Sequence, residues 1–456
     1  MFDKLAHMDM LHGPLWGKLA LFALPLALTS VLQQLCNAAD VMVLGRYVGN
    51  DEMAAVGNNI PIVALIVCLF VGLSLGSNVV MARYIGRGEP GEATRAMHSS
   101  LWLALASGLL IAAGGWIFAP EIIVSLGVPE AVREPALVYL RWYFLTMPFI
   151  SFFNFEAAFF RSVGDTGTPL VALAITCAVN AAGDVLAVTA LNGGITGVAA
   201  ATLVAYAMGA AFLWHRLRKA QGLLHLDYKK LGIFDIRKAR AALAIGLPAG
   251  IQGMVFAGSN IVIQAFINEL GADAMAGSAA AFSIEINVYC CLNAFGMAAT
   301  TFIGQNAGAG SLERCRRVFW DVFWWDMGIA MFMSAVGWCL APWLLSFFTD
   351  KEALVTVGMI RLLFVLVPQA LNALIEIFSG ALRGYGFSLP PALIALVCVC
   401  GERLIWVYTM FPLKPDYTTL METYPISWAL TVLLLWAVYA WFMKYRAASV
   451  VAGKRR

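Results

Sequence analysis

The sequence predicts an all-α polytopic membrane protein with twelve transmembrane helices, arranged as two parallel, pseudo-repeated six-helix lobes around a central cleft. Composition is the first reason, because 61% of the 456 residues are hydrophobic and only 12% are charged, whereas soluble domains carry about 25% charged residues. The other two reasons are a series of long apolar segments and a repeat that relates the two halves of the chain.

Each apolar segment has roughly 20 residues, enough to cross a hydrocarbon core of ~30 Å. The segments run approximately over 20–45, 54–82, 97–119, 136–160, 168–190, 195–215, 240–268, 275–304, 318–341, 357–381, 389–412 and 424–444. The first of them is too long for a signal peptide and no cleavage site follows it, so we expect it to remain as a span.

Basic residues indicate the orientation in the membrane. If the N-terminus is cytoplasmic and the spans alternate, most Lys and Arg residues fall in the inner loops and at the termini. This asymmetry predicts a multi-pass protein of the plasma (inner) membrane with both termini in the cytoplasm. The longest inner loop, 215–240, is basic and predicts a linker with an amphipathic, surface-lying piece. It separates an N-lobe, 1–214, from a C-lobe, 241–456.

Short motifs recur in the same order in the two halves. The pairs are ALP (23–25) with GLP (246–248), YVGNDEMAAVG (47–57) with ELGADAMAGSA (269–279), YIGRGEPGEATR (84–95) with FIGQNAGAGSLERCRR (302–317), and RSVGDTGTP (161–169) with RGYGFSLPP (383–391). Six spans are an even number, so both halves enter the membrane from the same side. The repeats are therefore parallel, and a substrate is expected at their interface.

The first span carries unusual polar residues, namely Gln33, Gln34, Asn37 and Asp40. A carboxylate inside the hydrocarbon costs about 2.5–3.5 kcal/mol on insertion scales, so such residues usually face a protein interior or a water cavity. The alternative is that Asp40 lies at the headgroup level, as a helix-end residue without a special role.

A second polar helix supports the interpretation that Asp40 faces the protein interior or a water cavity. Asn180 and Asp184 are one turn apart on the fifth span, and therefore share a helix face. Both Asp40 and Asp184 are expected in the outer halves of their spans, and Thr202 in the sixth span at a similar depth. Their oxygens predict a site that binds Na⁺ or holds H⁺ between neighbouring carboxylates. The alternative is a purely structural polar network between helices.

Further polar residues inside spans are candidates to line a substrate cleft. The whole set of cleft candidates is Gln33, Gln34, Asn37, Glu156, Gln252, Glu285 and Glu376. Glu156 and Glu376 fall at equivalent places in the two halves. Glu285 has no partner on its own helix, so we expect it to line the cleft, with an interfacial position as the alternative.

Other chemistry has little support in this sequence. The nine cysteines show neither metal-ligand spacing nor an extracellular disulfide framework, so they are expected to pack as small apolar residues. No nucleophile–base pattern accompanies the five histidines, which favours a transporter over an enzyme. No cofactor, no resident metal and no nucleic-acid partner are expected.

The two-fold layout, the corner RSVGDTGTP with its partner LRGYGFSLPP, and above all IGQNAGAG at 303–310 resemble the MATE family of multidrug and toxic compound extrusion transporters. The resemblance covers the chain from about Pro25 to Tyr445. It implies two six-helix lobes that export organic cations and drugs in exchange for Na⁺ or H⁺. The family's N-lobe cation site, an Asp, an Asn–Asp pair and a Thr, matches Asp40, Asn180, Asp184 and Thr202.

One departure concerns the C-lobe. The NorM-like branch has a Glu in the seventh span and an Asp in the tenth, whereas this chain has Phe256 and Asn372 there. The resemblance therefore shifts the expected coupling site to the N-lobe, with Glu285 and Glu376 as the remaining source of C-lobe acidity.

The sequence thus predicts a monomeric secondary active exporter of small organic cations that works by alternating access in the lipid bilayer, with Na⁺ or H⁺ as the coupling ion. The alternatives are a flippase of a lipid-linked saccharide or a dedicated metabolite exporter of the same superfamily. A membrane-bound enzyme or receptor would need a catalytic cluster or an extramembrane domain, which the sequence does not contain.

Overall fold

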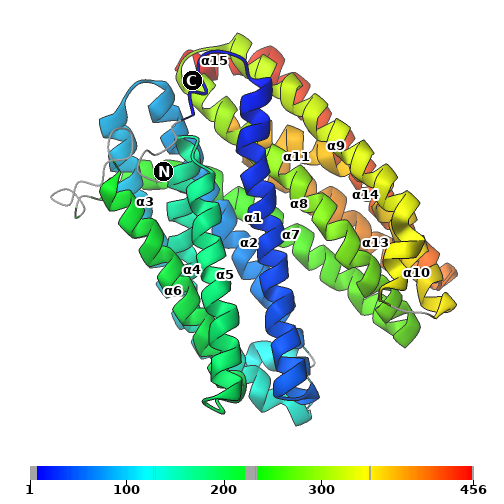
Figure 1. The fold of residues 1–456 in the computed structure, drawn as a ribbon. Helices are drawn as coiled ribbons and strands as arrows, with labels where there is room; N and C mark the ends of the chain where they lie inside the picture. Colours follow the sequence, from blue (N-terminus) through cyan, green and yellow to red (C-terminus); the bar gives the residue numbers. More distant parts are fainter. Residues whose placement is uncertain are drawn as a thin grey trace. The chain divides into compact units, whose positions relative to one another are not determined.

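The structure, a computed structural model, describes residues 8–126, 128, 130–220, 232, 234–348 and 351–453, and all regular structure in these ranges is helical (Figure 1). Within them, 11 helices are long and apolar enough to cross a membrane. The number becomes 12 if the bent pair Glu352–Val365 and Gln369–Gly384, which meet at 42°, forms one span. The prediction of about twelve spans is confirmed.

The first half contains α1 Trp16–Tyr47, α2 Asn50–Gly86, α3 Pro90–Ser125, α4 Glu130–Ser162, α5 Gly167–Thr189 and α6 Gly194–Lys219. The second half contains α7 Ile236–Glu269, α8 Ala272–Gly308, α9 Leu312–Ser346, α10 Glu352–Val365, α11 Gln369–Gly384, α12 Leu389–Ala395, α13 Glu402–Thr409, α14 Tyr417–Tyr445 and α15 Ala447–Val451, with the π-helical segment Leu396–Gly401 between α12 and α13. The surface-lying piece predicted for the linker falls largely on residues outside the described ranges.

The chain forms two compact units. The first contains Leu28–Gly250, and the second combines Asp9–Ala27 with Ile251–Arg456. Helices α1 and α7 therefore each contribute to both units. The lobe boundaries predicted from the sequence stay a prediction.

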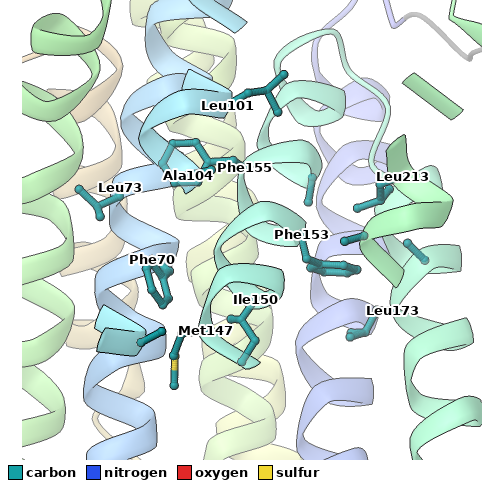
Figure 2. Close-up of a cluster of buried hydrophobic side chains, with 14 of the residues drawn as sticks. Phe70, Leu73, Leu101, Ala104, Met147, Ile150, Phe153, Phe155, Leu173 and Leu213 are labelled. Atoms are coloured by element: carbon teal, nitrogen blue, oxygen red, sulfur yellow. The ribbon is translucent and has the colours of Figure 1, made fainter. Parts of the chain in front are cut away.

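The first unit has its core around α4, which packs against α2, α3 and α6. Figure 2 shows side chains of α2 (Phe70), α3 (Leu101), α4 (Ile150) and α5 (Leu173) in this core. Lipid tails are as apolar as these side chains, so the association of such helices depends on close van der Waals packing.

In the second unit, α8 packs against α9, α10 and α11, and α14 packs against α10 and α11. The segment that precedes α1 is held to this unit by polar contacts. The carbonyl of Met10 accepts hydrogen bonds from Asn306 Nδ2 and Arg314 Nε, each at 3.2 Å. The ring of Trp16 stacks on that of Trp325 with centroids 4.7 Å apart. The N-terminal part of α1 is thereby anchored to the second unit.

Candidate functional site

The polar residues of α1 and α5 meet in the first unit. The side-chain amide of Asn180 donates to Oδ1 of Asp40 at 3.2 Å and to Oδ2 of Asp184 at 2.9 Å. Asn180 and Asp184 share a face because they are one helical turn apart, whereas Asp40 comes from another helix. One amide thus bridges two carboxylates that come from two different helices.

A cavity of ≈ 90 Å³ lies beside this network, within the first unit. It is lined by Gln33, Cys36, Asn37, Asp40, Val41, Val56, Ile60, Val63, Tyr139, Tyr143, Leu173, Thr176, Cys177, Asn180, Thr202 and Tyr206. Asp184 is fully buried and does not line the cavity. Asp40, Asn180 and Thr202, the other three residues predicted for the coupling site, line this cavity. Asp184 is linked to the cavity wall by its hydrogen bond with Asn180.

The network has an excess of negative charge. No Lys or Arg of the described ranges forms an ion pair with Asp40 or Asp184, and the buried Oδ1 of Asp184 has no hydrogen-bond donor among the described residues. Two ionised carboxylates without a positive partner are costly in a protein interior. The arrangement is therefore suited to holding a proton or a cation between them.

Thr202 lines the cavity, but its hydroxyl donates to the carbonyl of Val198 on its own helix at 3.1 Å. A threonine oxygen in this position still has lone pairs that can face a cation. The structure therefore places Thr202 near Asp40 and Asn180 without a direct hydrogen bond to either one.

Tyrosines complete the cavity wall. Tyr139 and Tyr143 lie one turn apart on α4, and the hydroxyl of Tyr206 on α6 donates to Oε1 of Gln33 at 3.4 Å. Gln33 in turn donates to Oδ1 of Asn37 at 3.4 Å. Tyr139 and Tyr206 are not among the residues that the sequence predicted for this site. The spacing of four between the two α4 tyrosines was the available signal.

The cysteines of this region are not merely packing residues. Cys36 on α1 and Cys177 on α5 form a disulfide, with Cα atoms 5.7 Å apart. The expectation that all nine cysteines pack as free apolar residues was wrong for this pair. The reason is that α1 and α5 cross closely, one turn from Asp40 on α1 and two turns from Asp184 on α5, so that two thiols distant in the sequence come together.

Gln34 and Glu156 do not belong to the network. Gln34 is half-buried on α1 and does not line the cavity. Glu156 is fully buried on α4, and neither of its carboxylate oxygens has a hydrogen-bond partner among the described residues. Its neutral, protonated form fits such surroundings, because an unpaired buried charge is costly.

Glu285 is buried in an ion pair and does not face a cavity as a free carboxylate. Arg361 of α10 donates to both of its oxygens, from Nε at 3.1 Å and from Nη2 at 2.6 Å. Arg361 also donates to Ser278 Oγ at 2.8 Å. The partner was not recognised because it lies on another helix, 76 positions along the chain.

Gln252 is likewise engaged by other side chains. Its Nε2 donates to Ser379 Oγ at 3.3 Å, and its Oε1 accepts from Arg383 at 2.9 Å. Both partners lie on α11, so Gln252 joins α7 to α11 within the second unit. Glu376, also on α11, is buried and accepts a hydrogen bond from the hydroxyl of Tyr289 at 3.2 Å.

The chain matches the family model MatE twice, over residues 25–186 and 248–409. The protein called probable multidrug resistance protein YoeA from Bacillus subtilis is 25% identical over 94% of both chains. The probable multidrug resistance protein NorM of Thermotoga maritima is 23% identical over 85% of this chain and 84% of its own. The FAD transporter of Shewanella oneidensis is 25% identical over 62% of this chain and 63% of its own.

Solved structures agree on the fold. A crystal structure of MATE in complex with MaL6 superimposes with a TM-score of 0.87 and 19% identity, covering 98% of this chain and 99% of that one. Because the two matched segments span most of the sequence, this chain belongs to the MatE family. It is a multi-pass membrane transporter of the MATE type, and the resemblance seen in the sequence is confirmed.

Proposed function

We propose that this transporter exports small organic cations in exchange for an inward-moving ion, which binds at Asp40, Asn180 and Asp184. The observation that carries the proposal is the single amide that bridges two carboxylates from α1 and α5. Thr202 contributes an oxygen to the same cavity. No cofactor takes part.

We infer that H⁺ is the coupling ion, because the two carboxyl groups bridged by the Asn180 amide have no Lys or Arg partner among the described residues, and one proton between them would remove the repulsion of two like charges. A proton shared by the two carboxyl groups needs no rearrangement of the amide. Loss of that proton leaves two like charges beside one donor, which weakens the close approach of α1 and α5.

We propose that loss of the shared proton shifts the equilibrium between the inward-facing and outward-facing arrangements of the helices. A ligand shifts such an equilibrium only through its different affinity for the two states. In this proposal, the two states differ in the distance between Asp40 and Asp184. The site binds the proton tightly only in the state in which the two carboxyl groups are close.

The test is ethidium efflux from proteoliposomes under separately imposed Na⁺ and pH gradients. Wild type is expected to export ethidium on a pH gradient, and Asp40→Asn and Asp184→Asn are expected to lose this activity. Gln34→Ala is the matched control, since Gln34 is on α1 but outside the cavity lining. Export driven only by Na⁺ would name Na⁺ as the ion, and absence of dye export under both gradients would contradict the organic-cation proposal.

A dedicated metabolite exporter is the second candidate, favoured by the match to the FAD transporter. The cavity beside Asp40 is lined by carboxylate, amide, hydroxyl and apolar groups, and includes no Lys or Arg. Such a lining suits a cation better than a dinucleotide with a negatively charged diphosphate. Inhibition of ethidium efflux by excess FAD would favour this second candidate.

A further inference from the structure

We propose that Glu92 and Arg314 are positioning residues for transport, which anchor the starts of the two helices that belong to both units. Arg314 holds the segment before α1, and Glu92 holds the start of α7. Helix α1 begins in the second unit and continues in the first, whereas α7 begins in the first and continues in the second. Each anchor lies within one unit, outside the network at Asp40.

Glu92 and Arg314 occupy equivalent positions in the repeat that relates the two halves of the chain. Gly88 follows α2 and Gly310 follows α8, with φ of 71° and 80°, a conformation that glycine adopts at little cost. Four residues after each glycine comes the third residue of the next helix, which is Glu92 on α3 and Arg314 on α9. One repeated turn therefore presents an acidic side chain in the first unit and a basic side chain in the second.

Arg314 binds the segment before α1 through the backbone carbonyls of that segment. Its Nε donates to the carbonyl of Met10 at 3.2 Å, and its Nη2 donates to those of His12 at 3.0 Å and Gly13 at 3.1 Å. Asn306, near the end of α8, donates to the same Met10 carbonyl at 3.2 Å. The side chain of Met10 is fully buried. A guanidinium group suits this task because it presents several donors in a fixed plane.

The docked segment is itself fastened to α1. Lys18 of α1 donates from Nζ to the carbonyls of Asp9 at 2.6 Å and His12 at 2.7 Å. Further along α1, the ring of Phe22 packs edge-on against that of Phe302 with centroids 5.4 Å apart. The segment and the first turns of α1 are therefore held as one piece.

Glu92 binds the start of α7 in the first unit. Its Oε2 accepts a hydrogen bond from Lys238 Nζ, which also donates to the hydroxyl of Tyr84 at 3.3 Å. The Lys238 side chain is 6% exposed, and a partly buried ion pair is screened less by salt than an exposed one. Beside this pair, the backbone N–H of Asp235 donates to Ser99 Oγ of α3 at 3.0 Å.

The anchors give α1 and α7 a mechanical role. A rigid helix carries a displacement from one site to another only if both of its ends are held. Helix α1 carries Asp40 in the first unit, and Arg314 fixes its start to the second unit. Without this anchor, a change at the proposed coupling site displaces a loose helix start and is not passed on to the second unit. The role of the anchors in transport therefore rests on the function proposed above.

The first experiment measures docking of the segment on the detergent-purified full chain and does not require transport. Hydrogen peroxide oxidises an accessible methionine to its sulfoxide and is itself reduced to water. In the wild type, buried Met10 is expected to react about tenfold more slowly than the partly buried Met8, because oxidation follows exposure. Tandem mass spectrometry distinguishes the two residues. In Arg314→Ala the rate at Met10 is expected to approach that at Met8.

Arg317→Ala is the matched control for this experiment. Arg317 is exposed on α9 and pairs with Glu313 of the same helix, so its loss is expected to leave Met10 protected. Arg314→Lys keeps the positive charge but lacks the planar fork of donors, and its Met10 rate is expected to lie between those of the wild type and Arg314→Ala. This variant also supplies the measurement if Arg314→Ala does not yield folded protein.

The second experiment measures ethidium export by proteoliposomes over a range of ethidium concentrations. Arg314→Ala and Glu92→Lys are expected to lower the maximal rate about tenfold and to leave the ethidium KM within about twofold of the wild-type value. The reason is that neither residue lines the cavity at Asp40. Adding Lys238→Glu to Glu92→Lys restores an ion pair of opposite polarity and is expected to recover export. Arg317→Ala is expected to export at the wild-type rate.

The two experiments separate failure of the anchor from failure of the proposed function. The anchor is overturned if Met10 stays protected in Arg314→Ala, or if wild-type Met10 reacts as fast as Met8. The positioning role is overturned if Met10 becomes reactive in Arg314→Ala while the maximal export rate is unchanged. If the wild type exports no ethidium, the organic-cation proposal fails, and the Met10 rates decide the anchor on their own.

Discussion

The side-chain amide of Asn180 lies 3.2 Å from the carboxylate of Asp40, although the two residues are 140 positions apart in the sequence. The same amide donates to Asp184. The two polar helices that the sequence singled out therefore meet, and a small cavity lies beside their contact.

Replacing Asn180 by Ala is expected to lower the initial rate of export by about 10- to 100-fold. A hydrogen bond to a charged group contributes roughly 1.5–3 kcal/mol, and the two carboxylates lose their common donor. Initial efflux rates in proteoliposomes measure the effect. Asn154→Ala is the matched control, because Asn154 Nδ2 donates to the carbonyl of Ile150 on its own helix, at 2.8 Å. Equal rates in the two variants would argue against a role for the bridge.

Cys36 and Cys177 are expected to resist thiol labelling in the unfolded, unreduced chain, because they are bonded to one another. After reduction both should become labelled. The free cysteines, for instance Cys68 and Cys339, should label under either condition and serve as internal controls. Peptide mass spectrometry measures the result, and labelling of Cys36 without reduction would contradict the pairing.

Loss of Arg361 is expected to destabilise the second unit. Arg361→Met leaves the buried Glu285 carboxylate unpaired, which costs about 3–5 kcal/mol. The double variant Glu285→Gln with Arg361→Met should recover much of that loss, since it removes both charges. Thermal unfolding measures both variants. If the single variant is as stable as the wild type, the ion pair does not hold α8 to α10.

Gly72→Ala is expected to destabilise the first unit by roughly 1–3 kcal/mol, the usual cost of overpacking. A Cβ at Gly72 would lie 2.1 Å from the backbone nitrogen of Gly250, so α2 and α7 would have to separate. Gly114→Ala is the control, because, apart from the adjoining residues and backbone of its own helix, no atom of the described residues lies within 4 Å of its Cβ position. Unfolding curves of the two variants in detergent should differ accordingly, and coincident curves would contradict the close crossing of α2 and α7.

Much of the candidate site could be predicted from local spacing. Asn180 and Asp184 share a face because a helical turn separates them, and carboxylates are rare enough in apolar spans to identify Asp40. Glu285 could not be identified as part of a pair in this way. Its partner Arg361 comes from another helix, and only the packing of α8 against α10 brings the two side chains together.

The sequence by itself determined the membrane class, the helical architecture and the twofold repetition, because apolar length and motif order are properties of the chain alone. The tertiary structure decided which polar residues are partners. It paired Glu285 with Arg361, Gln252 with Arg383 and Cys36 with Cys177. The physical reason is that a buried polar group must be satisfied by whichever helix packs against it, and helix periodicity carries no information about that neighbour.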